Sequence, residues 1–322
     1  MKIDVIKYRA LWWTISSLFI LGGIVCMIIS TTRPDIKAPF RLGLDFVGGT
    51  KLQFELDCTK DDCNKPIELS NIREVVSAQG LGDSSIQILS NKVLDKPQYG
   101  ISIRTKNLDV DQRTKLQDAI YKVRNFDPKK TQIDSVGPTL GKQLFQSALW
   151  AIALSFLGIL LYLTFRFQFD YSFFAFVALF HDVLITTGAF SFLGLIQGVE
   201  IDSLFVVAIL TIIGFSVNDT VVIYDRIREV LNDHPELPIN QIVDDAVNQT
   251  LTRSINTTFT VLLTLVSIFL FGGETLKNFA LALIIGFIAG AYSSIFIAGT
   301  LLAWWRENFS KNQSLPTPTT ES

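Results

Sequence analysis

Charged residues are scarce in this chain. Asp, Glu, Lys and Arg make up 18% of its 322 residues, whereas soluble domains carry about 25%. The 28 basic and 30 acidic residues nearly cancel, so the net charge is only −2. Binding to nucleic acid needs an extended basic surface, and we therefore expect no nucleic-acid partner.

The motifs of several enzyme classes are also missing. The sequence has no Walker motif, which argues against ATP as an energy source. The polar stretch 31–144 contains no catalytic triad, metal-ligand cluster or phosphate-binding loop. We therefore expect neither an enzyme nor a bound metal or cofactor.

Apolar residues, in contrast, are abundant and are collected into long runs. They make up 49% of the chain, and the mean hydropathy is +0.37. About 20 apolar residues of helix cross the hydrocarbon core of a bilayer. Six runs meet this length: 11–29, 145–165, 172–194, 203–224, 254–272 and 278–303. Because these runs are apolar on all sides, we predict six transmembrane helices.

The first run could instead be a cleaved signal peptide, since basic residues precede it. No A-x-A-like cleavage site follows, and the run is long for a signal peptide. We therefore expect an uncleaved span.

Basic residues beside the runs predict the orientation in the membrane. One side would hold both termini together with Lys2, Lys7, Arg9, Arg166, Arg226, Arg228, Arg253, Arg306 and Lys311. The short loops on the other side carry only Lys277. We therefore predict a cytoplasmic N-terminus and first span over 1–30, an exported domain over 31–144, a five-helix remainder over 145–303, and a cytoplasmic tail over 304–322. This tail becomes rich in Pro and Thr, and we predict that 304–322 is disordered.

The three cysteines fit this division. Cys26 lies inside the first run, whereas Cys58 and Cys63 lie in the exported stretch "DCTKDDC". Two nearby cysteines can close a disulfide loop in an oxidising compartment. Free thiols are the open alternative, and a metal site would need more ligands than this stretch supplies.

The exported stretch shows the pattern of a small α+β domain. Strand-like alternation occurs at 50–57, 84–90, 97–105 and 131–136, and helical spacing at 69–79 and 110–126. The order β-α-β-β-α-β predicts a ferredoxin-like domain between the first and second spans. That fold has many functions, so it does not identify one.

Asp219 is the least expected residue of the fourth run. It lies about five residues, or roughly 7–8 Å, inside the end of its helix, next to Asn218. A charge in mid-membrane is costly, so the carboxyl must be protonated, paired or hydrated. Because Asn or Ser would meet a packing role, we predict that Asp219 binds and releases a proton or an ion.

The fifth run supplies a candidate partner for Asp219. Arg253 begins one helical stripe that continues with Asn256, Thr257, Thr260, Thr264 and Ser267. Such a stripe belongs against another helix or around water rather than against lipid. We predict that Asp219 and Arg253 meet or exchange partners through water. For Asn218, Thr257 and Thr260, simple hydrogen bonding between helices is the open alternative.

Two further polar sites lie in the other runs. His181 and Asp182 are near the middle of the third run, and they form either a structural pair or a second proton-handling site. In the sixth run, Gly286, Gly290 and Ser294 are spaced four apart, which predicts close helix packing.

Five motifs occur in a characteristic order along the chain: "GLDFVGGT" at 43–50, "VGPTLG" at 136–141, "GFSVNDTVVIYDRIRE" at 214–229, "LTRSINTTFT" at 251–260 and "FALALIIGFIAGAYSSIFIA" at 279–298. With them the chain resembles the SecF branch of the SecD/SecF protein-export family, within the RND superfamily, over nearly its whole length. The signature residues of the first two motifs are Gly43, Asp45, Gly48, Gly49, Gly137, Pro138 and Gly141.

This resemblance implies a function. It implies a six-helix RND-type half in the bacterial inner membrane that works with SecD and the SecYEG translocon. It implies use of the proton motive force to draw secretory polypeptides across, with the proton-path acid at Asp219 and the basic residue of the fifth span at Arg253. An RND-type exporter of lipid or small molecules is the alternative. Such exporters usually have two repeats and larger exported domains, so the length of this chain argues against it.

Overall fold

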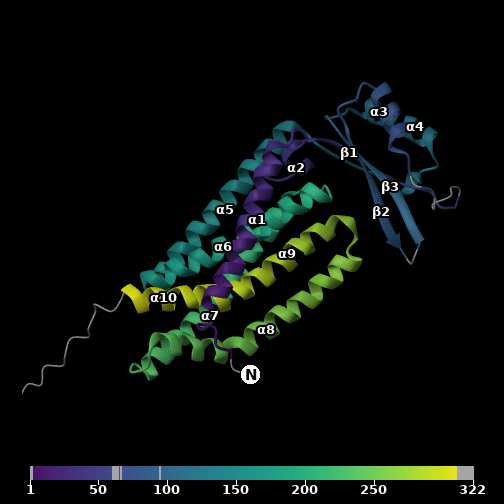
Figure 1. The fold of residues 1–322 in the computed structure, drawn as a ribbon. Coiled ribbons are helices and arrows are strands. Elements are labelled where there is room, and N and C mark those ends of the chain that lie inside the picture. Colours follow the sequence, from purple (N-terminus) through teal and green to yellow (C-terminus); the bar gives the residue numbers. More distant parts are fainter. Residues whose placement is uncertain (1–2, 60–64, 66, 94–95, 310–322) are drawn as a thin grey trace, which may run out of the picture. The chain divides into compact units, whose positions relative to one another are not determined.

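The computed structural model describes residues 3–59, 65, 67–93 and 96–309 in two compact units (Figure 1). We call the first the helical unit; it comprises Met1–Arg41 and Leu149–Ser322. The second, Leu42–Ala148, is the α+β unit.

Six helices in the described part of the chain are long and apolar enough to cross a membrane, which confirms the predicted number. They are α1 (Arg9–Thr32), α5 (Pro138–Arg166), α6 (Phe169–Ile196), α7 (Ser203–Asp233), α8 (Ile239–Phe271) and the stretch Leu276–Phe309. This last stretch starts within α9 (Gly273–Ser293) and continues through a π-helical turn η2 (Ser294–Ala298) and α10 (Gly299–Phe309).

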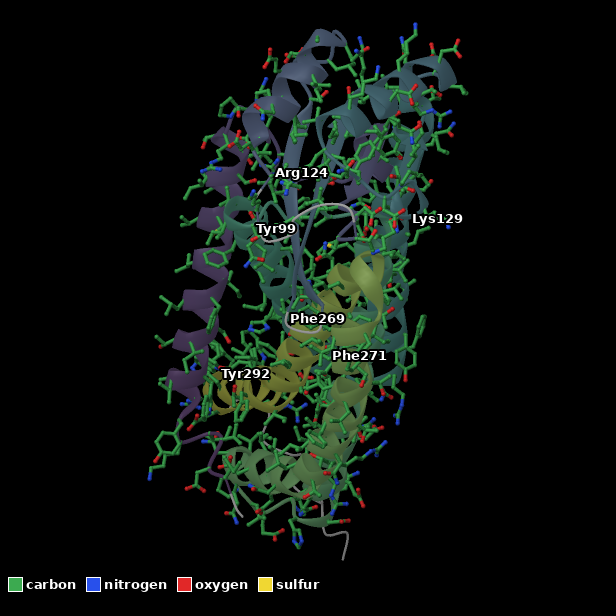
Figure 2. The ribbon with its side chains drawn as sticks, turned by 90° about the vertical axis from the view of Figure 1, so that its right-hand side faces the viewer. Tyr99, Arg124, Lys129, Phe269, Phe271 and Tyr292 are labelled. Carbon is green, nitrogen blue, oxygen red and sulfur yellow. The ribbon has the colours of Figure 1, made fainter. Side chains whose placement is uncertain are left out.

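The helices differ in how deeply they are buried. In α6, α7 and the last stretch, 50%, 50% and 61% of the most apolar window is buried, against 17%, 6% and 17% in α1, α5 and α8. Helices α6 and α7 and the last stretch are therefore central, whereas α1, α5 and α8 are peripheral. Large apolar side chains project outward from the peripheral helices, as Phe271 at the end of α8 does with 84% of its surface exposed (Figure 2). Such side chains suit contact with lipid.

Glycine lets α1 approach α6 closely. A Cβ atom added at Gly23 would lie 2.9 Å from the Cα atom of Gly188, and one added at Gly188 would lie 2.8 Å from the Cα atom of Gly23. Backbone therefore meets backbone at this crossing. The Trp13 indole also donates a hydrogen bond of 2.9 Å to Thr300 of α10.

The α+β unit contains the predicted strands and helices in the predicted order. They are β1 (Gly49–Glu55), α3 (Leu69–Ala78), β2 (Ser85–Val93), β3 (Lys96–Thr105), α4 (Val110–Val123) and β4 (Gln132–Val136). A short helix α2 (Leu44–Val47) and a 3₁₀ turn η1 (Pro128–Lys130) are additional to the prediction. The sheet has the order β2-β3-β1-β4, with every pair antiparallel.

One face of this sheet forms the core of the α+β unit. Alternate residues of β1 are buried, so that Leu52 and Phe54 point inward. Leu52 pairs with Ile103 of β3, and the apolar faces of α3 and α4 complete the core with Ile72 and Leu116. The period-two pattern of the sequence thus becomes one buried face.

The C-terminal end corrects one prediction. Residues 304–309 are helical, whereas the sequence predicted a disordered tail from 304. Aromatic packing explains the longer helix, because Trp304 packs edge-on against Trp13 and Trp305 stacks on Phe309. The rest of the predicted tail, 310–322, lies outside the described residues.

The predicted Cys58–Cys63 disulfide involves Cys63, which also lies outside the described residues. The pairing stays a prediction. Cys26 is a free cysteine in α1.

Candidate proton site in the helical unit

Asp219 lies half-buried on α7 and is held by two serines from other helices. Ser254 of α8 donates a hydrogen bond of 2.6 Å to its Oδ1, and Ser294 of η2 donates one of 2.5 Å to its Oδ2. Both serines are buried, at 1% and 0% exposure. Short hydroxyl–oxygen bonds of this kind are typical of an ionised acceptor. Within the described ranges, the hydrogen-bond partners of this carboxyl group are thus two hydroxyl groups.

Arg253 is not part of this site in the structure. Its side chain is exposed, and among the described residues no ion pair joins it to Asp219. Asn218 is also exposed. A role for Arg253 as the partner of Asp219 therefore stays a proposal that needs a second arrangement of the helices.

Within the membrane-spanning part of α8 there are three faces. Ser254, Thr258 and Leu265 are buried against the bundle, and Ile255, Phe259, Leu263, Val266 and Leu270 form an exposed apolar face. The third face, here called the polar face of α8, consists of Arg253, Asn256, Thr257, Thr260, Thr264 and Ser267, all of them exposed. No described residue of the helical unit covers this face, and polar side chains of membrane helices normally meet another helix or water.

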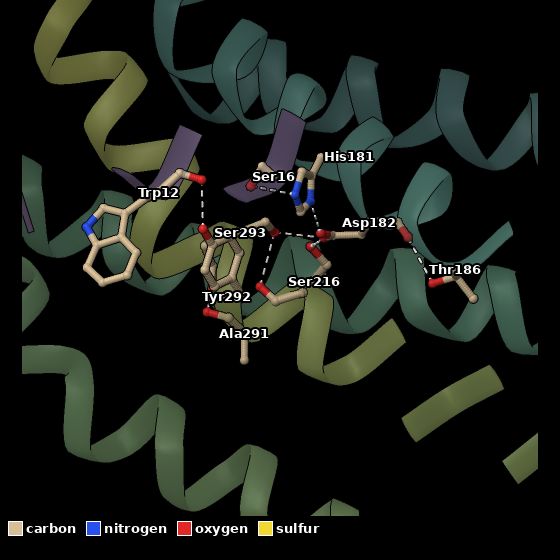
Figure 3. A network of polar contacts seen from close by, with 11 residues as sticks. Trp12, Ser16, His181, Asp182, Thr186, Ser216, Ala291, Tyr292 and Ser293 are labelled. Carbon is tan, nitrogen blue, oxygen red and sulfur yellow. Dashed lines mark hydrogen bonds and ion pairs between the residues drawn. The ribbon is translucent and has the colours of Figure 1, made fainter. Parts of the chain in front are cut away.

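A second buried network surrounds His181 and Asp182 (Figure 3). The Nδ1 atom of His181 lies 2.9 Å from Asp182 Oδ1, and its Nε2 atom lies 3.0 Å from the Ser16 hydroxyl of α1. Ser216 of α7 and Ser293 of α9 donate to Asp182 Oδ2 at 2.6 and 2.9 Å. Asp182 is 0% exposed, and all its oxygen atoms have partners.

An apolar cavity of about 300 Å³ lies beside this network, between α1, α6 and α9. Its lining includes Ser16, His181 and Tyr292. The ring of Tyr292 stacks on that of His181 at 6.1 Å, and its hydroxyl donates to the carbonyl of Trp12 at 2.8 Å (Figure 3). His181 therefore lines this cavity as well as the polar network.

Sequence reasoning missed the serines of both networks. Ser254 lies within the quoted motif of the fifth span, but it was not among the residues assigned to the helical stripe that begins at Arg253. Ser294 was assigned to packing, whereas its hydroxyl holds Asp219. The packing prediction does hold for Gly286, where an added Cβ would lie 2.1 Å from Ile212. The run of polar residues "YSS" at 292–294, inside an apolar span, was the sequence feature that could have indicated a hydrogen-bonding role for these serines.

The first two signature motifs meet in the α+β unit. Gly48 and Gly49 have φ of +75° and +120°, values that L side chains rarely adopt. A Cβ atom on Gly49 would lie 2.4 Å from the carbonyl oxygen of Thr105, and one on Gly48 would lie 3.0 Å from Pro138. One on Gly141 would lie 3.1 Å from the backbone nitrogen of Gly48. The signature glycines therefore join the start of β1 to the start of α5.

Three further signature residues flank this junction. Gly43 precedes α2 in extended conformation, and Asp45 lies in the first turn of that helix. Gly137 lies between β4 and α5, and a Cβ atom there would meet nothing within 4 Å. Close packing thus accounts for some signature glycines but not for Gly137.

Comparison with known protein families gives two matches. Residues 115–308 match the family described as "Protein export membrane protein SecD/SecF, C-terminal", and residues 36–60 match the "SecD/SecF GG Motif". The first match covers more than half of the chain.

Similar proteins agree with these matches. The chain is 55% identical to a protein translocase subunit SecF from Synechocystis sp., with 95% of each chain covered, and 38% identical to one from Thermobaculum terrenum, with 94% covered. Among solved structures, it is similar to SecDF from Thermus thermophilus, titled a translocon-associated membrane protein, with 25% identity and a TM-score of 0.78. That match covers 95% of this chain and 39% of the SecDF chain.

Proposed function

Because the chain belongs to the SecD/SecF family of protein-export membrane proteins, we propose that it is a SecF-type subunit of the translocation machinery. With SecD it uses the proton motive force to promote translocation and release of secretory polypeptides at the periplasmic side of SecYEG. It is a multi-pass membrane protein, and in this proposal it lies in the bacterial inner membrane with both termini in the cytoplasm.

One observation carries the proton-driven part of this function. Asp219 is a carboxylate within a membrane-spanning helix, and buried serines hold both of its oxygen atoms. A proton that falls through 100 mV releases about 2.3 kcal/mol. Binding of that proton removes the charge that the two serines stabilise, so it weakens the links from α7 to α8 and η2. Proton binding can thus change how these helices pack.

The polar face of α8 supports a partner within the membrane. Its side chains are exposed in the isolated chain, and polar residues in a membrane normally face another helix or water. Arg253 belongs to this face and sits beside Ser254, which holds Asp219. A second six-helix protein packed here would cover the polar face and bring its own groups close to Asp219. We assign this surface to SecD.

The α+β unit is, in this proposal, a ferredoxin-like periplasmic domain that contacts the moving polypeptide. Its β-α-β-β-α-β order and the antiparallel sheet β2-β3-β1-β4 support the fold.

An export assay with variants of the polar face of α8 tests the function and the partner together. In cells depleted of this chain, the wild type should restore the part of precursor export that a proton ionophore abolishes. Thr257→Leu with Thr260→Leu should co-isolate with SecD several-fold less well and lose most of this ionophore-sensitive export, because leucine removes the polar contacts.

The control for this assay is Ile255→Leu with Phe259→Leu, on the apolar face of the same helix. It should behave as the wild type in both measurements. Wild-type export that is equal with and without the ionophore would rule out the proposed function, and normal co-isolation of the Thr257/Thr260 variant would rule out the assigned surface.

Reporter cysteines test the orientation. In a background without native cysteines, Lys129→Cys in the α+β unit should react with a membrane-impermeant thiol reagent in cells with a permeabilised outer membrane. Asn232→Cys near the end of α7 should react only after the inner membrane is opened. Both positions are exposed in the structure, so the difference reports the side of the membrane. The reverse pattern would invert the proposed topology.

A further inference from the structure

Two stretches of chain connect the buried carboxyl group of Asp182 with the half-buried carboxyl group of Asp219. At the junction of α9 and η2, Ser293 donates to Asp182 at 2.9 Å and the next residue, Ser294, donates to Asp219 at 2.5 Å. On α7, Ser216 donates to Asp182 at 2.6 Å, and Asp219 itself follows three residues later, on the same side of the helix. Asp182 and Asp219 are therefore connected through two helices at once.

The His181–Asp182 pair can take up a proton without moving a heavy atom. With Asp182 ionised and His181 neutral, Nδ1–H donates to Asp182 and the Ser16 hydroxyl donates to Nε2. When a proton binds at Nε2, this nitrogen becomes a donor and the Ser16 hydroxyl becomes its acceptor. The distances of 2.9 and 3.0 Å suit both states. Only a hydroxyl proton has to rotate.

Each serine hydroxyl at the π-helical turn has two hydrogen-bond acceptors within reach. A serine hydroxyl has one proton. Ser293 lies 2.9 Å from Asp182 Oδ2 and 3.2 Å from the carbonyl of Gly290. Ser294 lies 2.5 Å from Asp219 Oδ2 and 3.2 Å from the carbonyl of Ala291. An ionised carboxylate attracts the hydroxyl proton more strongly than a carbonyl does.

Protonation of either carboxyl at Oδ2 changes the acceptor of the serine proton. The carboxyl then donates, the serine accepts, and the serine proton turns to the carbonyl of its own helix. The carbonyls of Gly290 and Ala291 belong to the turn that precedes η2. Protonation of either carboxyl therefore rearranges hydrogen bonds in the same turn. The π-helix occurs mostly as single turns inside α-helices, and such turns are frequently found at functional sites.

We propose that Asp182, paired with His181, is a second proton-binding group, and that Ser293 and Ser294 make its proton occupancy depend on that of Asp219. This inference rests on the proposed function, in which Asp219 binds a proton. In that cycle Asp182 has a positioning role, since its proton state acts on Asp219 through the two serines.

Few other titratable groups face Asp182. Its own helix contributes His181, α9 contributes Tyr292 stacked on that histidine, and α7 contributes Asp219. The remaining charges on the packed helices lie near the helix ends, where Arg306 pairs with Asp170 and Arg9 pairs with Glu307. Among the described residues, a pH response close to Asp182 therefore reports on the two carboxyls, His181 and Tyr292.

Infrared difference spectroscopy across pH tests this proposal on the full chain, purified with its membrane partner in lipid nanodiscs. The carbonyl stretch of protonated carboxylic acids is the signal. Asp182→Asn should remove one pH-dependent band. Asp219→Asn should remove another and shift the midpoint of the Asp182 band by about one pH unit or more, as expected of coupled sites. Ser293→Ala with Ser294→Ala should reduce that shift.

The control is Thr186→Val, because the Thr186 hydroxyl donates only to the backbone carbonyl of Asp182. It should leave both bands unchanged. If Asp182→Asn fails to fold, His181→Gln provides a second test, since it should shift the midpoint of the Asp182 band. The proposal would be overturned if no Asp182 band appeared at any pH. It would also be overturned if the midpoint of the Asp182 band were the same in the wild type and in Asp219→Asn. Neither result depends on export, so the proposed function is judged separately.

Discussion

Export by the Asp219→Asn variant is expected to lose its dependence on the proton gradient. Asparagine keeps the shape of the side chain but cannot ionise. Its amide group would meet the Ser294 hydroxyl, which now donates to Asp219 at 2.5 Å and would have to turn toward the carbonyl of Ala291. The variant is therefore fixed in the state that resembles protonated Asp219. Coupling free energies of about 1–3 kcal/mol correspond to factors of roughly 5 to 150, so we expect a loss on the order of tenfold.

The measurement is the rate of precursor export at equal protein level, with and without a proton ionophore. Asp219→Glu keeps an ionisable group and should retain part of the response. Asp233→Asn, at the exposed end of the same helix, is the control and should export normally. The Asn variant should still co-isolate with SecD. Wild-type export from Asp219→Asn would end the proton-carrier proposal, and failure of co-isolation would reduce Asp219 to a structural group.

A valine at Gly23 is expected to separate α1 from α6. Its Cβ atom would lie 2.9 Å from the Cα atom of Gly188, where no flexible side chain can yield. Overpacking of this kind costs about 1–3 kcal/mol. The Ser16–His181 hydrogen bond belongs to the same α1–α6 contact, so the shift would also open the network around Asp182. We expect a lower thermal unfolding midpoint and faster proteolysis of α1 in the purified protein.

Gly22→Val is a closely matched control. Gly22 is the neighbouring residue of the same helix, and a Cβ atom there would meet nothing within 4 Å. It should unfold at the same temperature as the wild type. Equal destabilisation by both substitutions would show that valine disturbs α1 itself and that the crossing with Gly188 is unimportant.

The spans were predictable because hydrophobicity over twenty residues does not depend on how a helix is rotated. The strands and helices of the α+β unit were predictable for a related reason, since alternation along β1 directly gives the buried face with Leu52 and Phe54. These patterns are local, because the type and the buried face of each element follow from a single periodicity in the sequence.

The partners of Asp219 were harder to predict because they depend on rotation. Arg253 and Ser254 are neighbours in the sequence but about 100° apart around α8, so a small error in orientation exchanges one for the other. Electrostatic reasoning favoured the charged residue, whereas the structure brings the serine to Asp219. Serine and threonine are common in membrane helices and give little signal until the facing carboxylate is known.

The polar face of α8 also bears on how the complex is made. The hydroxyls of Thr257, Thr260 and Ser267 each donate to the carbonyl four residues earlier, at 2.8, 2.8 and 2.9 Å. Their donor capacity is therefore met inside the helix, so no donor among these three is exposed to hydrocarbon, while each hydroxyl oxygen can still accept a hydrogen bond from a partner. These three hydroxyls therefore add little to the cost of inserting the chain before its partner arrives, whereas Arg253 and Asn256 of the same face keep exposed polar groups for the partner to cover. Biogenesis of the two halves then needs no common synthesis, only a later encounter in the plane of the membrane.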